Sequence, residues 1–153
     1  MRTIAILVFA ALMAISLPAL AASDSGTRDE AVAMVKRVVA TFQKYGPQET
    51  FKEVSDKTNK KFHEHGLYPF IYDFSGKCVA HGARPTLIGK NLIGVKDPDG
   101  KFLIREMIEL AKKKGSGWMK YRWSNPMTKN IEEKSSYIER MGDYFVGVGI
   151  FKL

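Results

Sequence analysis

The chain has 153 residues, of which 45% are hydrophobic, 26% charged and 11% aromatic, and its formal net charge is +8. This length favours one domain with a single substantial core, and the ordinary composition excludes disordered, collagen-like and coiled-coil chains. The single cysteine excludes an intrachain disulfide framework and a cysteine-built zinc site, and the sequence has no C-x-x-C-H motif for haem attachment. The basic excess leaves three partner classes open: nucleic acid, an anionic membrane surface, or a small anionic ligand.

The N-terminal segment has the features of a secretory signal peptide. Arg2 precedes an apolar run over residues 4–17, and Ala19-Leu20-Ala21 has the small-x-small form that a signal peptidase accepts. We therefore expect cleavage after Ala21. The alternative is an uncleaved anchor, because the apolar segment is barely long enough to span a bilayer.

Cleavage divides the chain into a signal peptide, residues 1–21, and a single exported domain, residues 22–153. The expected location is periplasmic or secreted, without stable membrane insertion after cleavage. Export argues against a nucleic-acid partner. Most of the basic residues lie where a solvated face or a helix end is expected, as in Lys112 to Lys114, so the net charge alone does not indicate a polyanionic partner.

Two helical segments are predicted at the start of the exported domain. Thr27 to Glu30 has the spacing of a capping box, and apolar residues follow it at helical intervals. Gly46-Pro47 is expected to end this helix and to begin a shorter one in which Phe51 and Val54 share a face. The stripe expected to be buried comprises Ala31, Met34, Val35, Val38, Val39, Phe42 and Tyr45.

Alternating strand patterns follow. Residues 67–74 and 77–81 are predicted to form a hairpin that turns at Ser75-Gly76. The connection over residues 82–100 is rich in Gly, Pro, Asn and Asp, and loops of this length in small domains are often functional.

The last third of the chain is predicted to hold one helix and three strands. The helix follows Asp97-Pro-Asp-Gly100, with Asp99 as the capping residue, and the strands cover residues 117–124, 131–140 and 144–152. The order helix, helix, strand, strand, helix, strand, strand, strand predicts an α+β domain with a five-stranded antiparallel sheet.

Catalytic and metal-binding motifs are weak. Cys78 lies in a predicted strand and is expected to be a small core residue, and the sequence has no nucleophile elbow, phosphate-binding glycine loop or H-E-x-x-H motif. We therefore predict that the protein is not an enzyme and has no cofactor. His63-Glu-His65 offers only two metal ligands, so solvated loop histidines are expected. Asp97-x-Asp99-Gly100 lacks the other acidic positions of a calcium loop.

Aromatic and cationic residues gather on two neighbouring predicted strands. They are Trp118, Tyr121, Trp123 and Tyr137, with Lys120, Arg122 and Lys134. A small carboxylate needs one cation and a few hydroxyl or indole donors in a mainly apolar cleft, and Lys134, Tyr121, Tyr137 and Trp123 supply such groups. The alternative is a hydrophobic sheet face with the lysines and arginines on its wet side.

Several spaced sequence blocks resemble single Cache domains of the second type. The blocks are Tyr68-Pro-Phe-Ile-Tyr-Asp-Phe-Ser-Gly-Lys-Cys-Val-Ala-His81, Leu87-Ile-Gly-Lys-Asn-Leu92, Asp97-Pro-Asp-Gly-Lys-Phe102, Gly115-Ser-Gly-Trp-Met-Lys-Tyr-Arg-Trp-Ser-Asn-Pro126, Lys134-Ser-Ser-Tyr137 and Gly147-Val-Gly-Ile-Phe151. The resemblance covers roughly residues 30–152. It implies a PAS-like fold in which a long N-terminal helix packs on a five-stranded antiparallel sheet.

The resemblance also implies an extracytoplasmic sensor that binds short carboxylic acids such as acetate, propionate, pyruvate or lactate. Carried over to this sequence, the ligand pocket is expected to be lined by Tyr72, His81, Met107, Tyr121, Trp123, Lys134 and Tyr137. In this hypothesis Lys134 neutralises the carboxylate, Tyr121 and Tyr137 donate hydrogen bonds, and Trp123 packs on the alkyl part. His81 is expected to add a donor whose charge depends on pH.

Cache domains mostly occur between membrane helices and a cytoplasmic output domain. Here Leu153 follows directly after the last predicted strand, so we expect a separate membrane receptor, kinase or transporter to receive the signal. The alternative function is an accessory protein that docks on a membrane partner without a small ligand. A metal-dependent function is a third possibility.

Overall fold

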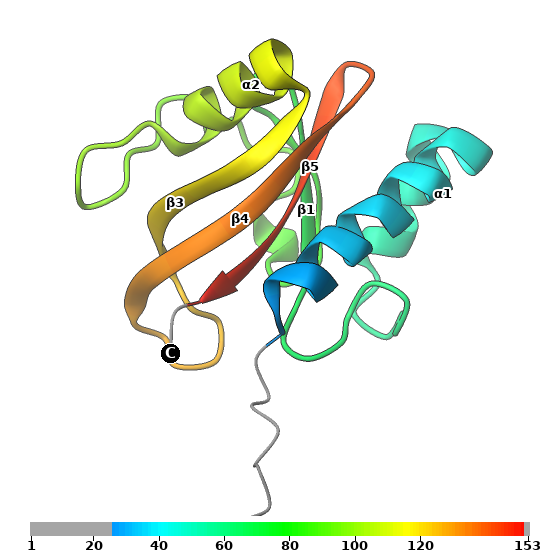
Figure 1. The fold of residues 1–153 in the computed structure, drawn as a ribbon, viewed down its shortest axis with the longest axis horizontal. Coiled ribbons are helices and arrows are strands. Elements are labelled where there is room, and N and C mark those ends of the chain that lie inside the picture. Colours follow the sequence, from blue (N-terminus) through cyan, green and yellow to red (C-terminus); the bar gives the residue numbers. More distant parts are fainter. Residues whose placement is uncertain (1–25, 152–153) are drawn as a thin grey trace, which may run out of the picture.

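The computed structural model describes residues 26–151, and the predicted signal peptide lies outside this range. Within this range the fold consists of two α-helices and the predicted five-stranded antiparallel sheet (Figure 1). The two N-terminal helical segments predicted on either side of Gly46-Pro47 are joined into one kinked helix. The elements are α1 (Arg28–Ser55), β1 (Pro69–Asp73), β2 (Cys78–His81), the short 3-10 helix η1 (Pro85–Leu87), α2 (Leu103–Lys114), β3 (Ser116–Ser124), β4 (Ile131–Met141) and β5 (Tyr144–Phe151). Neither α1 nor α2 is both long enough and apolar enough to cross a bilayer.

The strands form one antiparallel sheet in the order β2-β1-β5-β4-β3. The last strand in sequence, β5, lies in the centre, between β1 and β4. Its register places Gly147 opposite both Phe70 of β1 and Ile138 of β4, and Gly149 opposite Ser136 of β4. Two glycines of one strand therefore share the middle of one face, since residues two apart in a strand point the same way.

Each face of the sheet is covered by one helix (Figure 1). Because neighbouring strand residues point to opposite faces, Ile71 of β1 packs under α1, whereas Phe70 and Tyr72 pack under α2. The α1-side core comprises Ala31, Met34, Val35, Val38, Val54, Phe62, Leu67, Ile71, Ala80, Met141, Val146 and Val148. The α2-side core comprises Phe70, Tyr72, Cys78, Leu92, Leu103, Ile104, Met107, Ile108, Ala111, Met119, Tyr121, Ile138 and Phe145.

Helix α1 begins at the predicted capping box and bends at the predicted break. The Glu30 amide donates to the Thr27 hydroxyl at 3.2 Å, and the Thr27 amide donates to the Glu30 carboxylate at 2.7 Å. Gly46 has φ 79, which joins two helical segments across a kink.

The expectation that Tyr45 is buried is wrong, because its side chain is 53% exposed. Phe42 and Phe51, one from each side of the kink, pack edge-on against Tyr144, with ring centroids 5.8 and 5.1 Å away. The kink thus brings the second segment over this end of the sheet. Phe51, rather than Tyr45, covers Tyr144.

The turn before α2 is organised by Asp97 rather than by the predicted cap Asp99. The Asp97 carboxylate accepts hydrogen bonds from the backbone amides of Asp99 (3.0 Å), Lys101 (2.9 Å) and Arg122 (3.2 Å). The residue that caps α2 is Phe102, whose side chain makes no capping hydrogen bond. The prediction for Asp99 is therefore wrong: the carboxylate that satisfies the free amides belongs to the buried Asp97, two residues earlier.

The connection after β2 runs back along the outer edge of that strand. The Cys78 amide donates to the Lys90 carbonyl (2.9 Å), the Gly89 amide to the Cys78 carbonyl (2.8 Å), and the Leu92 amide to the Gly76 carbonyl (2.9 Å). These bonds satisfy backbone groups that an edge strand otherwise leaves open. Leu87, Leu92, Ile93 and Val95 also pack on the α2-side core. The long loop is thus an integral part of the fold.

Candidate functional site

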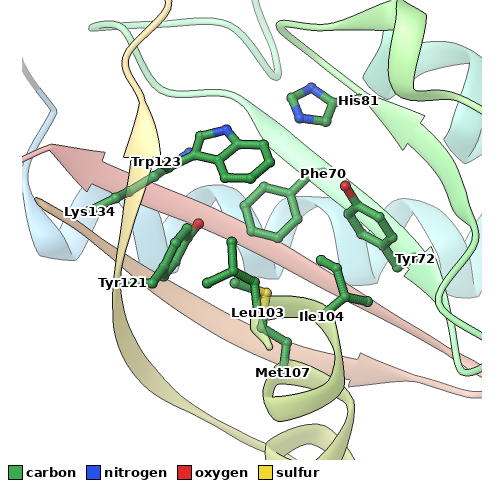
Figure 2. A pocket seen from close by; sticks show the side chains of 9 residues that line it. All are labelled: Phe70, Tyr72, His81, Leu103, Ile104, Met107, Tyr121, Trp123 and Lys134. Carbon is green, nitrogen blue, oxygen red and sulfur yellow. The ribbon is translucent and has the colours of Figure 1, made fainter. Parts of the chain in front are cut away.

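A pocket opens between the first turns of α2 and the sheet (Figure 2). It contains about 290 Å³ of empty space, its open mouth included. Six of the seven residues expected from the sequence line it, namely Tyr72, His81, Met107, Tyr121, Trp123 and Lys134. Phe70, Leu103 and Ile104 complete the lining. A pocket with mainly apolar walls and few polar groups suits a small ligand that has an apolar part and a polar end.

Lys134 is a buried cation, with only 1% of its surface exposed. Its side chain passes over Gly149 of β5, and Nζ donates a hydrogen bond to the Tyr68 hydroxyl at 3.0 Å. The ring centroids of Tyr68 and Phe151 lie 4.4 and 4.9 Å from Nζ. Burial, together with the positive charge of Arg84, lowers the pKa of Lys134 to about 7. None of the ion pairs within residues 26–151 includes this lysine.

His81, at the end of β2, is a neutral donor. Its Nδ1 accepts hydrogen bonds from the backbone amides of Ala83 (3.1 Å) and Arg84 (3.0 Å), so the ring proton lies on Nε2. Burial, followed by the positive charges of Lys134 and Arg84, lowers the pKa of His81 to about 3. The expectation that the charge of His81 changes with pH in the physiological range is therefore wrong. The imidazole stays neutral there.

Two tyrosine hydroxyls supply further polar groups. Tyr121 OH and Ser136 Oγ share a hydrogen bond of 2.8 Å. Figure 2 shows the hydroxyls of Tyr72 and Tyr121 on the side of the pocket where His81 and Trp123 lie. Burial raises the pKa of both tyrosines, so both hydroxyls keep their protons and remain available as hydrogen-bond donors.

Tyr137 lies on the opposite face of the sheet from the pocket. It packs on the α1-side core, with its ring centroid 5.6 Å from that of Trp118. Lys134 and Ser136 point toward the α2 side, and strand residues separated by an odd number point to opposite faces. The structure therefore brings six of the predicted site residues together and separates the seventh from them.

Arg84 connects the long loop to β3 and contacts two residues of the pocket lining. Its Nη2 donates to the Ser124 carbonyl at 3.2 Å, and its guanidinium carbon lies 5.6 Å from the Trp123 ring centroid. Its backbone amide is one of the two donors to His81. Arg84 thus contacts both His81 of β2 and Trp123 of β3.

Sequence reasoning missed five residues in or near the pocket, namely Tyr68, Phe70, Arg84, Leu103 and Ile104. Tyr68 and Phe70 precede Tyr72 at spacings of two, so strand periodicity provides a signal for them. The sequence identifies Leu103 and Ile104 only as buried residues of a predicted helix, not as part of a pocket. Arg84 carries no signal, because its position depends on the path of a loop.

The histidines and acidic residues do not converge on a metal site. His63 contacts the carbonyl oxygens of Asn59 (3.0 Å) and Gly82 (3.1 Å), whereas His65 Nδ1 lies 2.9 Å from the Glu30 carboxylate. Among residues 26–151, no group of three such side chains is placed to hold a metal ion.

Cys78 is fully buried, as expected for a core residue, and burial raises the pKa of its thiol to about 11. The thiol therefore stays protonated at physiological pH, and a protonated thiol is a poor nucleophile.

Known proteins resemble this chain in both sequence and structure. The methyl-accepting chemotaxis protein McpP of Pseudomonas putida is 32% identical over 91 residues, which are 58% of this chain and 17% of that protein. The sensor histidine kinase MctS of Rhizobium johnstonii is 34% identical over 86 residues, 55% of this chain and 18% of that protein. The matched region is thus less than a fifth of either relative.

The solved structures agree in fold. A methyl-accepting chemotaxis protein from Vibrio parahaemolyticus superimposes with a TM-score of 0.70 at 25% identity, covering 81% of this chain and 87% of that one. A Cache chemosensory domain that recognises carboxylic acids gives 0.65 at 24% identity, covering 80% and 86%. Residues 27–151, most of the chain, match the Cache domain family. This protein therefore belongs to the Cache domain family.

Proposed function

We propose that this protein is an extracytoplasmic sensing module that binds a short carboxylic acid of the acetate, propionate, pyruvate or lactate type in the pocket beneath α2. The observation that carries the proposal is Lys134, a lysine 1% exposed that lines a small and mainly apolar pocket. An ammonium removed from water is stabilised chiefly by a partner of opposite charge. A carboxylate supplies that charge and accepts hydrogen bonds as well.

Each polar group has a role in this proposal. Lys134 pairs with the carboxylate, and the Tyr121 and Tyr72 hydroxyls donate hydrogen bonds to it or to an oxygen on the adjacent carbon. The Nε2 proton of His81 is a further hydrogen-bond donor to the oxygens of the ligand. Trp123 and Met107, with their apolar neighbours, pack against the alkyl part of the ligand.

The lining also disfavours ligands that carry an ammonium group. No aspartate or glutamate lines the pocket, and Arg84 adds positive potential close to Lys134. An amino acid would bring its own positive charge into a site with no negative partner for it. We therefore infer that propionate binds better than alanine.

The relatives support a role for this proposed binding in signal transduction. One relative is a methyl-accepting chemotaxis protein and the other is a sensor histidine kinase, and the solved Cache chemosensory domain recognises carboxylic acids. Because the solved Cache chemosensory domain is only 24% identical to this chain, its similarity supports the fold alone. The ligand class proposed here therefore rests on Lys134. We propose that the bound protein signals to a membrane receptor, kinase or transporter, and that binding involves no catalysis and no cofactor.

The proposed arrangement of the chain is a signal peptide over residues 1–21 followed by one sensing domain over residues 22–153. Cleavage after Ala21 would release the domain into the periplasm or the medium. Mass spectrometry of the protein exported by its host tests this step. An N-terminus at Ala22 is expected, and retention of Met1 would favour the anchor.

Isothermal titration of the purified full chain with acetate, propionate, pyruvate and lactate tests the ligand class. At least one acid is expected to bind with 1:1 stoichiometry, and Tyr121→Phe is expected to weaken binding about tenfold by removing a buried donor. Tyr137→Phe is the matched control. It removes the same hydroxyl on the other face of the sheet and should leave the affinity unchanged.

Two outcomes would contradict the proposal. Absence of binding by all four acids would leave the ligand-free docking function as the better hypothesis, tested by salt-sensitive pull-down from solubilised membranes. Equal losses in Tyr121→Phe and Tyr137→Phe would show that binding occurs outside this pocket.

A further inference from the structure

We propose that Gly149 is a positioning residue for the acid site: the absence of a side chain at this position of β5 lets Lys134 cross the strand and bring its ammonium into the pocket. The consequence for binding rests on the proposed function. The positioning itself is a property of the unliganded protein, so it can be tested separately.

The space above Gly149 is occupied by two polar groups of the site. A β-carbon at position 149 would lie 2.5 Å from Lys134 Cε and 2.2 Å from Ser136 Oγ. Both distances are far below van der Waals contact, so a methyl group there would displace one or both side chains. Ser136 Oγ in turn bonds Tyr121. The polar groups from β3 and β4 therefore both depend on this gap.

The sheet register explains why the lysine needs the gap. Lys134 of β4 is opposite Phe151 of β5, and Ser136 is opposite Gly149. Yet the Lys134 ammonium bonds Tyr68, which directly precedes β1 on the far side of β5. The lysine stem must therefore lie over β5, where its ammonium meets the Tyr68 hydroxyl.

Gly147 plays the equivalent part for a residue of β1. A β-carbon there would lie 2.3 Å from the Phe70 ring. Phe70 and Lys134 thus lean inward from the two neighbours of β5, each over one glycine. Neither glycine has a positive φ, so the requirement at both positions is for space and not for an unusual backbone conformation.

The test replaces Gly149 with alanine and follows the titration of the Lys134 side chain in the unliganded full chain. The ¹³Cε signal is observed by NMR and assigned by its loss in Lys134→Met. In the wild type it is expected to titrate near the low pKa of about 7. In Gly149→Ala the displaced ammonium regains water, so its pKa should rise by at least one unit. Affinity for the best-binding acid should fall at least tenfold.

Gly94→Ala is the matched control, because a β-carbon at position 94 meets no atom within 4 Å. It should leave both the titration and the affinity unchanged. An unchanged Lys134 titration in Gly149→Ala would overturn the proposal. If the titration moves but the wild type binds none of the four acids, Gly149 still positions the lysine and only the proposed function fails.

If the Gly149→Ala variant fails to fold, a second experiment still tests the proposal. The same substitution is then made in a chain that carries Lys134→Ala and Ser136→Ala, which removes both clashing side chains. Recovery of cooperative unfolding there would support competition for the space above β5. Failure to fold in both backgrounds would contradict it, because the steric conflict would then lie elsewhere.

Discussion

At the scale of single residues, burial of the Lys134 ammonium destabilises the unliganded fold, and the proposed carboxylate ligand would offset that cost. Its ammonium is buried among aromatic rings, and burial holds its pKa near 7 instead of the usual value of 10.5. Between these two values the unfolded chain binds more protons than the folded one. Stability therefore rises with pH over this range, and the lysine destabilises the unliganded fold most at neutral and lower pH.

Lys134→Met is expected to stabilise the unliganded protein while abolishing acid binding. Methionine keeps much of the apolar stem but carries no charge to desolvate, so the free energy of unfolding at pH 7 should rise by about 2 kcal/mol. Urea unfolding at pH 7 and pH 9 measures the effect, which should shrink as wild-type Lys134 loses its proton. A variant less stable than the wild type at pH 7 would contradict this view of the lysine.

The same pKa makes acid binding dependent on pH. Below pH 7 the unliganded lysine is charged and affinity should be constant until the ligand itself protonates. Above pH 7 it must take up a proton to pair with a carboxylate, so affinity should fall about tenfold per pH unit. His81 contributes no step, because its low pKa keeps it neutral. Calorimetry in buffers of different ionisation enthalpy should detect proton uptake at pH 8, and constant affinity from pH 6 to 9 would contradict the assignment.

At the scale of elements, the long loop is held against β3 at both ends. Arg84 bonds the Ser124 carbonyl near the start of the loop, and Asp97 bonds the Arg122 amide near its end. Lys101 also donates to the Lys120 carbonyl at 2.7 Å. These bonds hold the loop and the start of α2 in place over the strand that carries Tyr121 and Trp123.

Asp97→Ala is expected to loosen this loop. Burial alone would raise the pKa of Asp97, but the backbone hydrogen bonds lower it, so the carboxylate is charged at neutral pH. Losing three charge-assisted bonds should reduce stability by about 2 kcal/mol and speed hydrogen exchange at Lys101 and Arg122. Asp99→Ala is the control, since its exposed carboxylate makes only a 3.8 Å ion pair. Equal effects of the two substitutions would argue against the role of Asp97.

Periodicity and turn chemistry were sufficient to predict the elements, whereas most of the pocket residues were expected only from the resemblance to Cache domains. Capping at Thr27 and alternation in the strands are local properties, and the structure confirms both. The errors at Asp99 and Tyr137 have different origins, a neighbour distant in sequence for the first and a local spacing for the second. Asp97 is favoured over Asp99 because β3 adds a donor, and Tyr137 faces away because a spacing of three reverses the face of a strand. No local pattern could place Arg84 beside Trp123 and His81.

At the scale of the whole molecule, one sheet separates two cores with different tasks. The α1-side core packs the kinked helix against the sheet. The α2-side core contains the pocket, and two of its lining residues, Phe70 and Lys134, lie over the two glycines of β5. The strands are shared, but the side chains alternate, so each face can be altered with limited effect on the other.

A matched pair of methionines tests this separation of stability from binding. Met34 is fully buried in the α1-side core, and Met107, 1% exposed, lines the pocket. Met34→Ala and Met107→Ala should each reduce the free energy of unfolding by about 3 kcal/mol, since both leave a cavity. Only Met107→Ala should also weaken acid binding, because it removes a pocket wall. Calorimetry at 10 °C, after circular dichroism has shown both variants to be folded, makes the comparison. A comparable loss of affinity in Met34→Ala would mean that the two cores are coupled through the sheet, as would be needed if movement of α1 reported ligand binding to a partner.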